Sequence, residues 1–228
     1  MNYEGSKFSK SKGWGVFCEN LPKYGIHPDY WRFALSLMLP ENRDSDFTWK
    51  LFEEFVNKEL IGNVINLSYR VLSFTYNKFG GDLTDTKPKE EILDYIKKYK
   101  QEIEDLFEKV ELVNALKKIL EFSALGNKLF QEAEPWKNPD KEFLKAMLYY
   151  VKALAIFIYP YIPFTAEKIL KTLNYKENFS WEDSINFEDL GKISKPKPFL
   201  KKLSKNDIEL LKEKTTKPTD FEKIIKNL

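Results

Sequence analysis

Residues 47–79 read FTWKLFEEFVNKELIGNVINLSYRVLSFTYNKF. Apolar side chains recur through this stretch at a period near 3.6 residues, the period of an α-helix that buries one face. The apolar positions are Leu51, Phe52, Phe55, Val56, Leu60, Ile61, Val64, Ile65, Leu67, Val71 and Leu72. We expect one long amphipathic helix, or two end to end, that ends at Gly80-Gly81. Its apolar stripe needs partner helices, and the flanking sequence supplies them.

The helical period continues on both sides of this stretch. It predicts a short helix from His27-Pro28 to about Pro40, and further helices over residues 88–107, 111–134, 138–157 and 163–173. In the fourth of the long helices we expect Asn138 as N-cap and Pro139 at the first helical position. Gly15-Val16-Phe17 indicates a short strand, and the last fifty residues indicate an extended arm with one or two surface helices. The predicted fold class is all-α: an antiparallel helical bundle preceded by a short loop and helix.

Composition excludes some kinds of function and leaves others open. The chain has 228 residues, 43% of them hydrophobic, which is enough for one sizeable core or two modest ones. Its 37 basic and 35 acidic residues nearly cancel, so any nucleic-acid surface must be local. The clearest local excess is six lysines from Lys192 to Lys205 with no acid between them, for which a solvated tail is the simpler interpretation.

Cysteine and histidine are almost absent. A single cysteine, Cys18, excludes an internal disulfide, and with the single His27 it excludes a zinc cluster, so we predict no metal site. We expect Cys18 to be a core or interface residue. The N-terminus lacks a secretory signal, and the longest apolar run, around residues 154–162, is too short to span a bilayer. We therefore expect a cytoplasmic protein without a membrane partner.

A lysine- and serine-rich run lies near the N-terminus. It reads Lys7-Phe8-Ser9-Lys10-Ser11-Lys12-Gly13. Ammonium groups, hydroxyls and backbone N–H groups on one loop stabilise the negative charge of a polyphosphate. Taken alone, such a short run is more often a solvated tail.

Several motifs in order, from Met1 to about Leu203, resemble the methionyl-tRNA synthetase family. Residues 7–11 resemble its KMSKS loop in a Phe-containing form, 25–33 its stem-contact segment and 44–49 its entry into the anticodon-binding bundle. Residues 181–183 and 193–199 resemble its C-terminal arm. The resemblance divides the chain into a KMSKS and stem-contact segment (1–45), an anticodon-binding bundle (46–175), and an arm and tail (176–228). We expect residues 204–228 to lie outside the resemblance, as an atypical tail or a partner-binding helix.

Asn66 and Arg70 match the family's Asn-x-x-x-Arg element, whose side chains read anticodon bases. On a regular helix they lie about 40° apart, opposite the apolar stripe, so we expect both to point outward. An amide and a guanidinium one turn apart suit the edges of unpaired bases, although such a pair is also common on a solvated helix face.

The dipeptide Pro135-Trp136 resembles the family's Pro-Trp element, whose indole stacks on an anticodon base. Most tryptophans are core residues, but the junction between two helices would leave Trp136 within reach of a base. Asn127 stands where the family often carries Asn, and we interpret it as local support.

The resemblance implies a methionine–tRNA ligase that uses ATP with Mg²⁺ and reads the CAU anticodon of methionine tRNA. It implies that Lys10 is the principal catalytic and ATP-binding residue, with Lys7, Ser9 and Ser11 shaping the loop. The family's HIGH-type motif needs two histidines, so we expect ATP and methionine to bind mainly to a catalytic half outside this chain. That half would be a separate subunit or an N-terminal region that has been removed, and this chain alone would be inactive.

Two alternatives stay open. One is a non-catalytic tRNA-binding or docking module with a vestigial loop. The other is the equivalent part of a sister class I synthetase for leucine, isoleucine, valine or cysteine. The combination of Asn66, Arg70 and Trp136 favours methionine.

Overall fold

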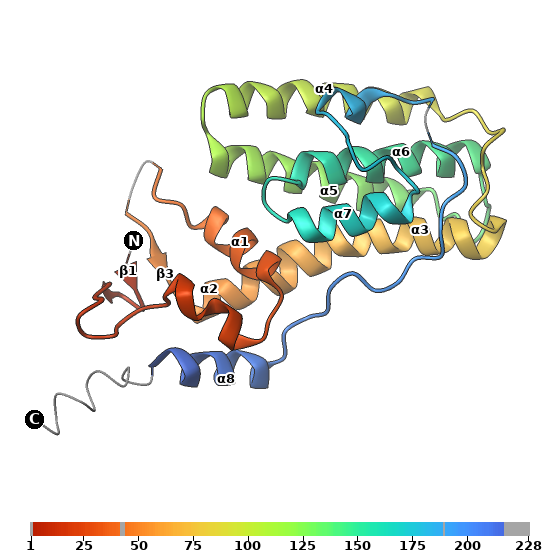
Figure 1. The fold of residues 1–228 in the computed structure, drawn as a ribbon. Helices are drawn as coiled ribbons and strands as arrows, with labels where there is room; N and C mark the ends of the chain where they lie inside the picture. The colour runs from red at the N-terminus through yellow and green to blue at the C-terminus, as the bar shows by residue number, and fades with distance from the viewer. Residues whose placement is uncertain (1, 42–43, 189, 217–228) are drawn as a thin grey trace, which may run out of the picture.

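The computed structural model describes residues 2–41, 44–188 and 190–216, and Figure 1 shows their arrangement. The α-helices are α1 (Pro28–Leu37), α2 (Trp49–Glu54), α3 (Asn66–Phe79), α4 (Glu90–Glu108), α5 (Leu112–Glu132), α6 (Lys141–Ile158), α7 (Pro163–Thr172) and α8 (Lys205–Thr216). A π-helical stretch, η2 (Phe55–Ile65), joins α2 to α3, and two 3₁₀ helices are η1 (Cys18–Tyr24) and η3 (Glu182–Ile185). Three two-residue strands, β1 (Asn2–Tyr3), β2 (Ser6–Lys7) and β3 (Asp46–Phe47), form a small sheet of order β2-β1-β3.

The expected long helix is confirmed as the continuous run α2, η2 and α3. The Thr48 hydroxyl caps its start by accepting the N–H of Leu51, and Gly80 ends it with a φ of +63°. The middle differs from the expected regular helix, because η2 is a π-helix over eleven residues. Its wider turns change which side chains face each neighbour.

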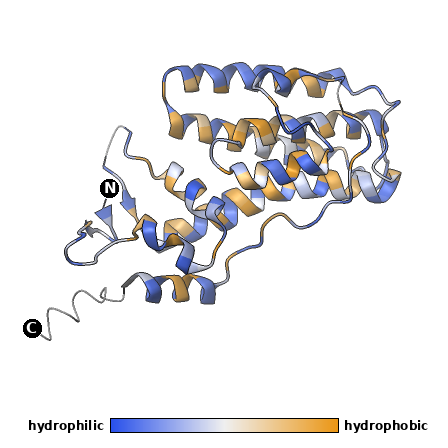
Figure 2. Ribbon diagram, in the orientation of Figure 1, coloured by the Kyte–Doolittle hydropathy of each residue, from blue (hydrophilic) through white to orange (hydrophobic). Residues whose placement is uncertain are grey.

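Helices α3 to α7 form the predicted bundle, with α6 at its centre (Figure 1). Helix α6 contacts α3, α4, α5 and α7, and each of its side chains from Phe143 to Ile158 is buried. Such a helix is mostly apolar because it has neighbours on every side. Figure 2 shows the same principle in α4, whose hydrophobic residues lie on the side toward the bundle. Two lysines of this helix, Lys145 and Lys152, are buried and donate to the backbone carbonyls of Leu190 and Asn186.

Two local predictions are wrong. Helix α6 is capped by Asp140, whose carboxylate accepts the N–H of Phe143, and not by Asn138. The N–H of Asn138 instead closes the preceding turn onto the carbonyl of Glu134, so the helix starts after this turn is complete. Residues 15–17 form no strand, because Gly15 lies in a bend with a φ of +143° and the nearest pairing is the isolated bridge between Ser9 and Trp14.

The predicted extended arm returns along the body of the molecule to the N-terminal segment (Figure 1). Asn57 of η2 holds it by exchanging two hydrogen bonds of 2.8 Å with the backbone of Leu203. Helix α8 then buries Ile208 and Leu211 and lies against α2. The last part of the expected tail, residues 217–228, lies outside the described residues.

Within the described part of the chain, every helix is too short or too polar to cross a membrane. Cys18 is exposed, so its expected place in a core is wrong in this chain. It begins the 3₁₀ helix η1, whose only buried residue is Tyr24.

Candidate functional site

The lysine- and serine-rich run forms a closed loop at the N-terminal end of the molecule. Ser9 and Trp14 exchange two backbone hydrogen bonds of 2.9 Å, and the N–H of Gly13 donates to the carbonyl of Lys10 at 3.1 Å. The indole N–H of Trp14 donates to the carbonyl of Tyr3 at 3.2 Å, and the two rings meet edge to face. The loop therefore has a defined base on β1.

The polar side chains of this loop face solvent. Lys7, Ser9 and Lys12 line an open hollow of about 550 Å³, whereas Lys10 and Ser11 are exposed beside it. The hydroxyls of Ser9 and Ser11 are 3.4 Å apart, so the loop brings them together. Accessible ammonium groups beside hydroxyls fit the chemistry of a phosphate ligand. Among the described residues, no group of three or more His, Cys, Asp or Glu side chains could hold a metal ion.

Asn66 and Arg70 lie in the seam between α3 and α5. Asn66 Nδ2 donates to Asn127 Oδ1 at 3.0 Å, and Arg70 Nη2 donates to Gln131 Oε1 at 3.1 Å. Asn66 is exposed as expected, but Arg70 is half-buried, with its guanidinium 5.0 Å from the centre of the Phe130 ring. The expectation that both side chains simply point outward is therefore wrong for Arg70, because α5 packs beside it.

Asn127 fixes the orientation of the Asn66 amide. Asn127 Nδ2 donates to the carbonyl and side-chain oxygens of Asn63 at 3.0 and 3.1 Å, and lies 3.2 Å from the Ser123 carbonyl. Its Oδ1 is then the atom that accepts from Asn66. The Asn66 nitrogen is used inside the seam, which leaves the Asn66 Oδ1 as the acceptor that a ligand would meet.

Trp136 lies in the turn between α5 and α6 and is 45% exposed. Its ring centre is 6.4 Å from that of Phe130, which also contacts the Arg70 guanidinium. The structure therefore brings Asn66, Arg70 and Trp136 to one surface, which we call the α3–α5 seam. The loop of Lys10 lies at the other end of the long helix (Figure 1), so the two groups of predicted site residues are separate.

Sequence reasoning missed Asn63, Phe130 and Gln131 as parts of this seam. One signal was present: Asn127 and Gln131 have the same four-residue spacing on α5 as Asn66 and Arg70 on α3. Two polar pairs of equal spacing on two helices of one predicted bundle are consistent with pairs that face each other.

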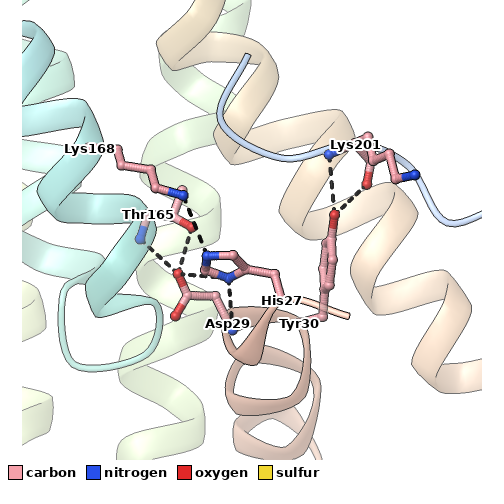
Figure 3. A network of polar contacts seen from close by, with 6 residues as sticks. All are labelled: His27, Asp29, Tyr30, Thr165, Lys168 and Lys201. Carbon is pink, nitrogen blue, oxygen red and sulfur yellow. Dashed lines mark hydrogen bonds and ion pairs between the residues drawn. The ribbon is translucent and has the colours of Figure 1, made fainter. Parts of the chain in front are cut away.

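A second polar network joins the N-terminal segment to the bundle (Figure 3). Asp29 of α1 is fully buried, and its Oδ2 accepts the backbone N–H and the hydroxyl of Thr165 at 2.7 and 2.6 Å. This carboxylate therefore satisfies the N-terminal end of α7. On the other side of α1, the Tyr30 hydroxyl donates to the carbonyl of Lys201 at 2.7 Å.

His27 lies at the edge of the same network. Its Nδ1 accepts the N–H of Asp29 at 3.2 Å and so caps α1. Burial lowers the pKa of His27, and Lys168 lowers it further although the Asp29 carboxylate acts in the opposite sense. His27 is thus the structural cap of α1.

The chain matches two models of protein families. Residues 1–72 match "tRNA synthetases class I (M)", and residues 89–225 match "Anticodon-binding domain of tRNA ligase". The second match continues well past Leu203, so the expectation that the resemblance ends there is wrong. Residues 205–216 belong to the folded domain because α8 is packed into the molecule through Ile208 and Leu211.

Relatives with curated names support this match. The methionine–tRNA ligase of Nanoarchaeum equitans is 40% identical over 97% of this chain and 28% of its own length. That of Methanopyrus kandleri is 35% identical over 93% of this chain and 33% of its own length. The chain thus spans about a third of the length of these curated relatives.

Solved structures support the fold. Mycobacterium tuberculosis methionyl-tRNA synthetase in complex with methionyl-adenylate superposes with a TM-score of 0.74 at 21% identity, over 86% of this chain and 42% of that chain. At this identity the likeness concerns the fold alone. Taken together, the two matched models and the curated relatives show that this chain belongs to the methionyl-tRNA synthetase family of class I tRNA synthetases, of which it spans the C-terminal region with the anticodon-binding domain.

Proposed function

We propose that this chain is the tRNA-reading part of a cytoplasmic methionine–tRNA ligase. In this proposal the α3–α5 seam binds the CAU anticodon of methionine tRNA, and the loop of Lys10 contributes to ATP-dependent activation of methionine. The observation that carries the proposal is that Arg70 of α3 and Trp136 of the turn between α5 and α6 meet at Phe130, while Asn127 of α5 holds Asn66 one turn away on α3.

The chemistry of the seam suits an unpaired base. Asn66 offers an oriented acceptor, Arg70 offers further N–H donors, and Trp136 offers an exposed ring face. Cytosine carries an amino donor beside acceptor atoms on its Watson–Crick edge, so an acceptor and a donor one helical turn apart complement it. Stacking on an aromatic ring contributes about 1–3 kcal/mol per base and is tolerant of base identity. Trp136 therefore supplies affinity, while Asn66 and Arg70 supply discrimination.

The loop supplies charge for a reaction whose other groups lie elsewhere. ATP, with Mg²⁺, provides the phosphoanhydride that is cleaved when methionine is activated. The exposed ammonium of Lys10 neutralises negative charge on the departing pyrophosphate, and the Lys7 ammonium contributes to the same effect. Ser9 and Ser11 hold the loop's shape. The proposal assigns ATP, methionine and most of their contacts to a catalytic half that is a separate subunit or a preceding region. In this chain, residues 1–45 are the loop and stem-contact segment. Residues 46–175 are the anticodon bundle, and residues 176–228 are the returning arm.

The test is direct binding of the purified chain to methionine tRNA and to a variant with one anticodon base changed, at one fixed moderate salt concentration. We expect a clear preference for CAU, which Asn66→Ala and Arg70→Ala reduce. Equal, salt-sensitive binding to both RNAs would contradict anticodon reading and favour a general docking module.

The loop requires a second measurement in the assembled enzyme. Lys10→Ala is expected to lower ATP–pyrophosphate exchange far more than it weakens tRNA binding, because its charge acts on the departing pyrophosphate. An equal loss of both would argue against this role. Strong exchange by the isolated chain would contradict the assignment of methionine and ATP to a missing half.

A further inference from the structure

Four lysines from two distant segments line one hollow beside the bundle. The hollow has a volume of about 450 Å³ and lies between α7 and the arm. Its lining, which we call the lysine pocket, comprises Lys168, Lys171 and Thr172 of α7 and Ser194, Lys195, Lys197, Pro198 and Phe199 of the arm. The basic run of the arm is therefore not a free solvated tail.

Hydrogen bonds pin the arm against the end of α7. The N–H of Ser194 donates to the carbonyl of Thr172 at 2.8 Å, and the Ser194 hydroxyl donates to Asn174 Oδ1 at 2.7 Å. Asn174 Nδ2 in turn donates to the carbonyl of Lys192 at 2.7 Å. Lys195 follows this anchor directly, so its position beside α7 is set by the backbone.

The positive charge of the pocket is poorly compensated. Within the described ranges, the only ion pair of these four lysines joins Lys171 to Glu177 at 3.7 Å, and both side chains are more than 70% exposed. Lys168 Nζ instead lies 3.5 Å from His27 Nε2 (Figure 3), and burial of that imidazole lowers its pKa and so favours its neutral form. The negative C-terminal end of the α7 helix dipole favours a cation near its last turn. It does not account for four lysines.

The lysine pocket adjoins the α3–α5 seam. The ring of Phe199, at the pocket, meets the ring of Tyr69 edge to face with centres 6.4 Å apart. Tyr69 is 38% exposed, precedes Arg70 directly and follows Asn66 by less than one turn of α3. At 100° per residue, Tyr69 lies about 60° round α3 from Asn66 and about 100° from Arg70, so the pocket and the seam lie on two flanks of this helix. An RNA strand with one base at Asn66 would cross Tyr69 to bring its neighbouring phosphates to the pocket.

We infer that the lysine pocket binds the phosphodiester backbone of the RNA whose anticodon lies in the α3–α5 seam. This inference rests on the proposed function for the identity of the RNA. Four ammonium groups suit phosphate oxygens, and they carry no information about base identity. The pocket thus supplies affinity and fixes the position of the RNA on the protein, whereas the seam discriminates between base sequences.

The test compares three double variants, each of which removes two positive charges. Lys168→Gln/Lys171→Gln and Lys195→Gln/Lys197→Gln each remove two charges from the pocket. Lys97→Gln/Lys98→Gln removes two exposed lysines from α4, which lies across the bundle from the arm near α3 (Figure 1). Affinity for methionine tRNA and for its one-base anticodon variant is measured as the salt concentration is raised.

We expect each pocket variant to weaken binding of both RNAs by the same factor. The slope of log K against log salt should fall in magnitude by about 1.4–1.8, because each phosphate contact contributes about 0.7–0.9. The α4 variant should keep the wild-type slope. Inorganic phosphate added at constant ionic strength should compete no better than chloride, because the expected ligand is a polymer that contacts several lysines at once.

The outcomes separate the two proposals. Pocket variants that behave like the α4 variant would overturn the inference, even if the wild-type chain prefers CAU. Selective competition by inorganic phosphate would also overturn it, since it indicates a small-anion site. Uniform weakening in a chain that does not distinguish the two RNAs would support the pocket and contradict anticodon reading. A wild-type chain that binds neither RNA would contradict both.

Discussion

Gly126→Ala is the substitution that most directly tests how the seam is positioned. Gly126 lies where α5 approaches α3 and α6, and an added Cβ would be 2.5 Å from Leu67 Cδ2 and 2.7 Å from Tyr150 Cε1. Neither neighbour has room to yield, because both are fully buried. The Tyr150 ring also stacks on Phe122 at 3.9 Å, and its hydroxyl donates to the Phe122 carbonyl at 2.6 Å.

The magnitude follows from these distances. Carbon atoms in contact prefer about 3.5–4.0 Å, so α5 must move away from α3 by about 1 Å. Overpacking of this kind costs about 1–3 kcal/mol, and the better helix propensity of alanine returns about 1 kcal/mol. We expect a net loss of about 0–2 kcal/mol in the free energy of unfolding.

The larger effect is expected at Asn127, the next residue of α5. Its 3.0 Å bond from Asn66 would lengthen to about 4 Å, beyond the range of a hydrogen bond. Without that bond the Asn66 amide is no longer held with its oxygen outward. The loss of one oriented hydrogen bond, about 1 kcal/mol, corresponds to roughly a fivefold loss of preference for CAU.

The assay combines urea unfolding with binding to methionine tRNA and its one-base anticodon variant. Gly191→Ala is the control, because an added Cβ there meets nothing within 4 Å. We expect Gly126→Ala to reduce the preference for CAU while affinity for the variant RNA stays near wild type. Full discrimination in a destabilised Gly126→Ala chain would refute the link between helix spacing and the orientation of Asn66. A gain in stability would refute the close approach itself.

Two further predictions concern carboxylates that accept several hydrogen bonds. Asp29→Ala should lower the free energy of unfolding by about 3–6 kcal/mol, because each of the two charge-assisted bonds to Thr165 contributes about 1.5–3 kcal/mol. Thr165→Val should lose only the hydroxyl bond, and strictly additive losses in the double variant would contradict the contact. Burial opposes ionisation of Asp183, but hydrogen bonds from Lys176 and Ser180 outweigh it and lower its pKa to about 2. Stability from this group is therefore complete above about pH 4 and is lost as the pH falls toward 2. Asp183→Asn should remove that part of the pH dependence of urea unfolding, and parallel curves for both proteins would count against it.

The helices were predictable because their information is local. The apolar period over residues 47–79 and over the later helices needs no knowledge of the partner, and the observed bounds differ by only a few residues. The wrong cap at Asn138 shows the limit of this reasoning. Asn138 and Asp140 are both good caps in sequence, and the choice depends on the turn that Asn138 closes with Glu134.

The candidate site was only partly predictable. Asn66, Arg70 and Trp136 could be selected by their resemblance to family motifs, and their roles remain predictions. The half-buried state of Arg70 was missed, because it depends on Phe130 and Gln131 of another helix. A helical period shows which face is apolar, but it does not show how closely a neighbouring helix approaches the polar face.

The sequence by itself determined the helical character of this protein, the order of its family motifs and the lysine-rich composition of its loop and arm. Only the tertiary structure decided that Asn66 meets Asn127 across 61 residues of sequence, and that lysines of α7 and of the arm share one hollow. The physical reason is that the helix face on which a side chain lies depends on its neighbours along the chain, whereas its contact partners depend on packing between helices. Here that packing is governed by contacts such as Gly126 against Leu67 and Tyr150, which no local pattern encodes.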